Sequence, residues 1–157
     1  MSDRALREQL AALLRWEDAH PGLDRIVAGV PQERWSASAQ GLPYTLWQLL
    51  EHLRLAQHDI LDFCRNPGYV ELRWPDDYWP PASTVPTPSE VSASLEGLRQ
   101  DRDALAGMAL DPKIDLFSRI PHGSGQTYLR ELLLVADHTS YHLGQIVVVR
   151  RALGIWD

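Results

Sequence analysis

The sequence contains few of the residues that disulfide scaffolds and nucleic-acid surfaces require. Cys64 is its single cysteine, so an intrachain disulfide is impossible, and this cysteine content suits a reducing compartment. The 15 Lys and Arg residues are outnumbered by 21 Asp and Glu residues, which leaves a net charge of −6. Because no basic cluster or nucleic-acid-binding motif offsets that charge, nucleic acid is not expected as a partner.

Long hydrophobic runs are also missing. No stretch reaches the roughly 18 consecutive apolar residues that a membrane span needs. Residues 1–10 carry charges in every turn and lack the apolar segment of a signal peptide. We therefore expect a soluble, cytoplasmic protein that does not bind membranes. Its 157 residues, 45% of them apolar, are sufficient for a single domain over residues 1–157 that folds without disulfides.

Apolar residues at helical spacing are what the sequence has in abundance. The first such segment covers residues 6–14 and 23–30, and it predicts either one helix kinked near Pro21 or two short helices. The second opens at a capping box formed by Thr45 and Gln48 and extends to about Phe63. Asn66-Pro67-Gly68 ends it.

Two further helices follow. Thr87-Pro88-Ser89-Glu90 supplies an N-cap, a proline at the first helical position and a capping-box glutamate for a helix that extends through Leu105. Thr127 caps the last helix, which ends where Gly154 can take a left-handed conformation. Four amphipathic helices without a convincing sheet predict an all-α fold, a four-helix bundle.

The segments between these helices differ in composition. Residues 68–86 hold two Trp, two Tyr and four Pro, so we expect a long, packed, irregular connection between the second and third helices. A connection of this length inside a small domain is often functional. Residues 111–125 are flanked by prolines and glycines and predict a loop with a short extended piece.

Three histidines are the candidate metal ligands. His138 and His142 stand four residues apart, which places both imidazoles on one face of the last helix. His52 lies among core-type residues of the second helix, and helical bundles build metal sites from side chains on such facing helices. Three nitrogens leave an open coordination position, as in catalytic zinc sites. From the residues alone, ordinary hydrogen-bonded histidines are an equal alternative.

The other three histidines are not expected to be metal ligands, and the residue after His138 argues against one class of metal enzyme. His58 lies about 240° around the helix from His52 and should face away. His20 and His122 adjoin prolines, so loop or helix-end roles are expected. Thr139 occupies the position where a zinc protease of the His-Glu-x-x-His type has its glutamate, which disfavours that class.

Several polar and aromatic side chains are candidates for supporting roles. Those phased with the histidines, and weighed as catalytic or positioning groups, are Gln145, Tyr141, Asp59 and Gln48. For each of them, ordinary bundle hydrogen bonding, packing or a surface charge is the alternative. In the long connection, Trp74, Tyr78 and Trp79 are expected either to wall a substrate pocket or to cover helix ends or a dimer contact.

The arrangement of these motifs resembles the DinB-like (DinB/YfiT) superfamily of metal-dependent enzymes. The resemblance is carried by His52 after Leu49-Leu50-Glu51, by His138-x-x-x-His142-x-Gly144-Gln145, and by the helix order from about residue 6 to residue 153. It implies a site of His52, His138 and His142 that binds nickel or zinc, with iron or manganese as alternatives. Some members of the superfamily use low-molecular-weight thiols such as mycothiol or bacillithiol, others are classed as hydrolases, and many form homodimers.

Two functions follow as hypotheses. The first is a metal-dependent enzyme acting on a small-molecule substrate, a transferase or hydrolase in which the metal activates a thiol cosubstrate or water. The second is a metal- or ligand-binding stress-response bundle without catalysis. The resemblance slightly favours thiol transfer, although no thiol-binding motif is visible in the sequence.

Overall fold

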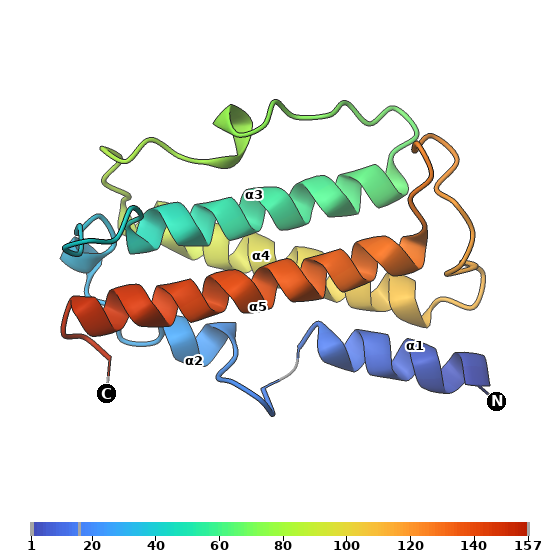
Figure 1. Ribbon diagram of the computed structural model, residues 1–157, viewed down its shortest axis with the longest axis horizontal. Coiled ribbons are helices and arrows are strands. Elements are labelled where there is room, and N and C mark those ends of the chain that lie inside the picture. The colour runs from blue at the N-terminus through green and yellow to red at the C-terminus, as the bar shows by residue number, and fades with distance from the viewer. Residues whose placement is uncertain (1, 16, 157) are drawn as a thin grey trace.

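The computed structural model describes residues 2–15 and 17–156, and these residues form an all-helical protein (Figure 1). Its α-helices are α1 (Ser2–Leu13), α2 (Leu23–Val27), α3 (Leu46–Arg65), α4 (Pro88–Leu110) and α5 (Tyr128–Ala152). Two 3₁₀ turns, η1 (Gln32–Arg34) and η2 (Asp76–Tyr78), lie in the connections. The described residues contain no strand, and their single isolated bridge, between Arg119 and Thr127, lies where a short extended piece was expected.

The helices form a bundle, which confirms the all-α prediction. α3, α4 and α5 are the three long helices, and α1 and α2 follow one another along the remaining side (Figure 1). Of the two alternatives for the first segment, two short helices is therefore the right one. Pro21 lacks a backbone N–H, and Gly22, in an extended conformation, caps α2. α2 ends at Val27, before the expected residue 30, because Gly29 has a φ of +68° that a helix cannot accommodate.

The predicted helix starts are all present. Capping boxes open α3 at Thr45 and α4 at Thr87, and the Thr127 side chain accepts a hydrogen bond from the backbone N–H of Arg130 in the first turn of α5. α3 ends at Arg65, close to the predicted end at Phe63, whereas α4 continues more than a turn beyond Leu105, to Leu110. Gly154 has a φ of +69°, the left-handed conformation expected after the last helix.

The apolar interior of the bundle consists of two clusters of buried side chains. One cluster contains α3 residues 46–53 and α5 residues 143–149, together with α2. The other contains α1, the end of α3 and α5 residues 132–136. On α5, His138 and His142 lie between the residues of the two clusters, whereas His52 lies within the α3 part of the first cluster. The three histidines are thus bordered by close-packed apolar side chains.

The long connection between α3 and α4 runs alongside α3 (Figure 1). It is irregular apart from η2, as its composition predicts. Trp79 packs against the first apolar cluster, whereas Val70, Trp74 and Val85 are exposed. The connection therefore covers α3 with part of its aromatic residues and leaves others in solvent.

The last helix is the only described helix whose length and composition would also allow it to cross a membrane. In the bundle it packs against α3 and α2, and it buries Glu131, His142 and Arg150. Buried charged and polar groups of this kind fit a helix whose partners are other helices, because lipid would leave them without hydrogen bonds.

Candidate metal centre

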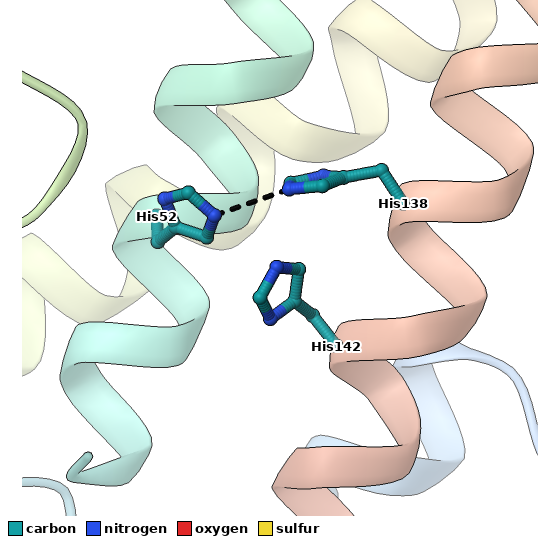
Figure 2. Close-up of side chains that lie close together, drawn as sticks. All are labelled: His52, His138 and His142. Atoms are coloured by element: carbon teal, nitrogen blue, oxygen red, sulfur yellow. Dashed lines mark hydrogen bonds between the residues drawn. The ribbon is translucent and has the colours of Figure 1, made fainter. Parts of the chain in front are cut away.

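Three imidazoles from two neighbouring helices converge inside the bundle. Figure 2 shows His52 on α3 facing His138 and His142 on α5. One ring nitrogen from each of these histidines lies within 4.8 Å of the other two, and Nε2 of His52 is 3.1 Å from Nε2 of His138. Nitrogens bound to one tetrahedral ion at about 2.0–2.1 Å would be roughly 3.3 Å apart. The nitrogens of His52 and His138 therefore have the separation of two ligands of one ion, and the nitrogen of His142 is near enough to be the candidate third ligand.

Two hydrogen bonds orient these rings. Nδ1–H of His52 donates to the backbone carbonyl of Tyr78 at 2.9 Å, and Nδ1–H of His142 donates to Oε1 of Gln145 at 2.6 Å. We assign these tautomers because both acceptors lack a proton to give. In each case Nε2 carries no proton, and Nε2 of His52 accepts a hydrogen bond from Nε2–H of His138 that a bound metal would replace. Partners of this kind set the tautomer and the ring orientation of metal-binding histidines.

Burial keeps the three rings in the form that binds metal. It lowers the pKa of His52 and of His138 to about 4, and the neighbouring imidazoles act in the same direction. Burial also lowers the pKa of His142, against the hydrogen bond from its ring to Gln145. All three are therefore neutral at pH 7, so an incoming cation does not compete with imidazolium protonation.

Aromatic rings enclose the cluster. Trp79 stacks on His52 with centroids 3.7 Å apart and planes 6° apart, and it also stacks with Tyr44. Trp74 approaches His52 edge-on, and Tyr141 approaches His142 edge-on at 4.9 Å. Tyr141 remains 63% exposed, so its side of the cluster borders solvent. Of the two tryptophans expected to wall a pocket, Trp79 has its ring closer to the histidines than Trp74.

The four candidate supporting residues separate into two pairs. Gln145 and Tyr141 contact His142 directly. Gln48 instead bonds the backbone N–H of Thr45 and the carbonyl of Pro80. Asp59 accepts hydrogen bonds from two tyrosines of the long connection and contacts no histidine. The structure thus brings two of the four candidates to the cluster.

The remaining histidines lie apart from the cluster, as expected. His58 pairs with Asp101 on α4. His20 bonds the carbonyl of Pro21 and lies within 3.4 Å of the Ser140 hydroxyl. His122 bonds the carbonyl of Phe63.

Two contacts of His52 were not predicted from the sequence. The Tyr78 carbonyl is a backbone group, which every residue carries, so no residue pattern marks it. The stacking of Trp79 on His52 depends on how the long connection folds back. In the sequence, the aromatic-rich composition of residues 68–86 was the signal that pointed to such a contact.

These features define the chain as a helical bundle with a candidate centre for a divalent metal ion. The family model described as the DinB superfamily matches residues 15–146, and the chain belongs to that superfamily. The resemblance expected from the histidine motifs is therefore confirmed. Comparison with curated proteins and with solved structures finds no match.

Proposed function

We propose that this protein is a metal-dependent enzyme that acts on a small molecule, with His52, His138 and His142 as the ligands of one divalent ion. The observation that carries the proposal is the convergence of three neutral imidazoles whose outer nitrogens, in His52 and His142, are already held by Tyr78 and Gln145. A surface pair of histidines would need neither burial nor such partners. Nickel and zinc are the expected metals, with iron and manganese as alternatives.

The residues around the cluster suit binding of a reactant beside the histidines. A divalent ion bound there supplies a positive charge that lowers the pKa of a thiol or water. Trp79 covers one face of His52 and excludes water from it. Tyr141 and Gln145 are the side chains that we propose for contact with a substrate, and this is supported by their contacts with His142 and by the exposure of Tyr141. What the resemblance implies about the superfamily slightly favours thiol transfer over hydrolysis as the proposed reaction.

One observation favours a second function, a bundle that binds metal or a ligand without catalysis. Within the described residues, the groups that contact the three histidines are aromatic rings, an amide and a backbone carbonyl, none of which is a carboxylate. Asp59, the best-phased carboxylate of α3, is engaged by two tyrosine hydroxyls. A site without a general base suits storage or sensing as well as it suits chemistry.

Metal analysis of single variants tests the feature that both functions share. We expect purified protein to carry about one divalent ion per chain, and His52→Ala, His138→Ala and His142→Ala each to lose most of it. His58→Ala is the matched control, because His58 lies on the same helix as His52 but pairs with Asp101. Equal metal content in the control and in the three variants, measured by elemental analysis, would exclude both functions.

Activity measurements then separate enzyme from binder. Low-molecular-weight thiols paired with electrophilic substrates would be assayed beside ester and amide hydrolysis. The enzyme hypothesis expects turnover that disappears on metal removal and returns when the metal is restored. A cytoplasmic location and homodimer formation stay predictions from the sequence and the resemblance, and sedimentation analysis of the mass in solution tests the dimer.

A further inference from the structure

Asp59 lies two turns after His52 on the same side of α3, about 10 Å further along the helix axis. Both of its oxygens accept hydrogen bonds. The hydroxyl of Tyr69 donates to Oδ1 at 2.9 Å, and the hydroxyl of Tyr78 donates to Oδ2 at 2.7 Å. Both tyrosines belong to the long connection, so one carboxylate on α3 holds two points of that connection.

Tyr78 links Asp59 to the candidate metal centre. Its hydroxyl binds Asp59, while its backbone carbonyl accepts Nδ1–H of His52 at 2.9 Å. The next residue, Trp79, stacks on the same imidazole. The position of Tyr78 therefore controls both the hydrogen bond that selects the tautomer of His52 and the ring that covers it.

Few other hydrogen bonds hold this part of the connection. Among the described residues, those that join residues 69–79 to α3 are the two to Asp59 and the one from His52 itself. The next is at Pro80, whose carbonyl accepts from Gln48. Burial and the neighbouring Asp59 raise the pKa of Tyr69 and of Tyr78, so both hydroxyls keep the protons that they donate. Hydrogen bonds from hydroxyls to a carboxylate are among the strong ones in proteins.

We propose that Asp59 is a positioning residue of the metal centre: by holding Tyr78 it keeps the Tyr78 carbonyl on Nδ1 of His52 and thereby directs Nε2 of His52 at the metal. The metal in this statement rests on the function proposed above. Asp59 neither touches the metal nor transfers a proton. Its carboxylate acts on His52 through the side chain and the backbone carbonyl of Tyr78.

Zinc affinity of folded variants tests this role. Zn²⁺ binding to the full chain would be measured by competition with a chromophoric chelator. We expect Asp59→Ala and Tyr78→Phe each to weaken binding about tenfold, the lower end of the effect of removing an outer partner of a metal ligand. The Zn²⁺ affinity of Asp59→Asn should lie between that of these variants and that of wild type, because an amide offers one acceptor oxygen where a carboxylate offers two. Tyr69→Phe should have a smaller effect, because Tyr69 has no contact with His52.

Controls distinguish positioning from general stability. Asp62→Ala removes another carboxylate of α3, one that accepts a hydrogen bond from the side chain of Asn66 and none from residues 69–79, and it should leave Zn²⁺ affinity unchanged. The double variant Asp59→Ala/Tyr78→Phe should bind no more weakly than Tyr78→Phe alone, because both changes break the same link. Wild-type affinity in Asp59→Ala or in Tyr78→Phe would overturn the proposal.

A measurement on metal-free protein keeps the proposal separate from the proposed function. In ¹H–¹⁵N NMR spectra of the imidazoles, we expect a slowly exchanging Nδ1–H of His52 in wild type and in Asp62→Ala. That signal should exchange rapidly in Asp59→Ala and in Tyr78→Phe. If wild type binds no Zn²⁺, the metal function fails and this signal still decides the role of Asp59. An unchanged signal in Asp59→Ala would overturn the inference while leaving the metal function standing.

Discussion

At the scale of single residues, the thiol of Cys64 is buried and unreactive. Cys64 is 5% exposed and lies near the end of α3. Burial raises its pKa to about 12, and the nearby carboxylate of Glu131 acts in the same direction. The thiolate is the nucleophilic form of cysteine, so the only thiol of the chain is inert in the folded state. Any thiol chemistry at the histidine cluster therefore requires a thiol from a cosubstrate.

Alkylation of Cys64 tests this conclusion. At pH 8, iodoacetamide should leave the native protein unmodified over a period in which it fully alkylates the protein unfolded in urea, because both accessibility and thiolate content are low in the fold. Mass spectrometry measures the modification. Cys64→Ala should keep its bound metal, since Cys64 is not among the candidate ligands. Rapid alkylation of native protein would contradict the burial and pKa of this thiol.

At the scale of the helix, α4 contributes structure without contributing a candidate ligand. Its start is a complete capping box, in which Oγ1 of Thr87 accepts from the N–H of Glu90 and the Glu90 carboxylate accepts from the N–H of Thr87. All three candidate ligands lie on α3 and α5. A substitution at the start of α4 should therefore lower the stability of the fold without changing its affinity for metal.

Thr87→Ala tests that separation. We expect the free energy of unfolding to fall by about 1 kcal/mol, the usual effect of losing an N-cap. Zn²⁺ affinity should not change. Ser92→Ala, at an exposed position within the same helix, is the control and should leave stability nearly unaltered. Urea unfolding and chelator competition measure the two quantities. A loss of affinity in Thr87→Ala would show that the start of α4 is coupled to the cluster.

The helix scale also shows where sequence patterns were sufficient. The N-caps and the helical period predicted the starts of α3, α4 and α5 and, closely, the ends of α3 and α5, because both are local properties of the chain. The same period left the first segment undecided between a kinked helix and two helices. A period reports which face is apolar, and it does not report whether the backbone between two apolar stretches stays helical.

At the scale of the whole molecule, a metal held by His52, His138 and His142 would join α3 to α5. Binding to the folded state alone stabilises it, by about 2.7 kcal/mol when the free metal is at 100 times its Kd. In a protein of this size, about 1 kcal/mol moves Tm by about 2–4 °C. We therefore expect saturating Zn²⁺ to raise Tm by about 5–10 °C, and chelation to reverse the change.

His138→Ala is the control for this measurement. It removes one candidate ligand from a partly buried position, so its Tm should not respond to Zn²⁺. The Tm of His58→Ala should rise with Zn²⁺ as that of wild type does. Scanning calorimetry at matched protein concentration measures both. An equal rise in Tm for His138→Ala would show that Zn²⁺ stabilises the protein at some other place.

The three histidines were identifiable from the sequence, whereas the groups that hold them were only partly so. His138 and His142 share a face because of helical geometry, and Gln145 follows on the same face. Asp59 was also in phase with His52, but its partners were not predictable, because Tyr69 and Tyr78 reach it from an irregular connection without periodicity. Phase along a helix placed Asp59 near the site, and the folded connection decided what it touches.

The sequence by itself determined the helical fold class, the helix starts and the spacing of the candidate ligands, because each depends on residues within a few positions of one another. The tertiary structure alone decided that α3 and α5 face each other at His52, that the Tyr78 carbonyl orients that ring, and that burial keeps the imidazoles neutral. These properties depend on contacts between residues far apart in the chain. Such contacts form only when the apolar faces of the helices pack together.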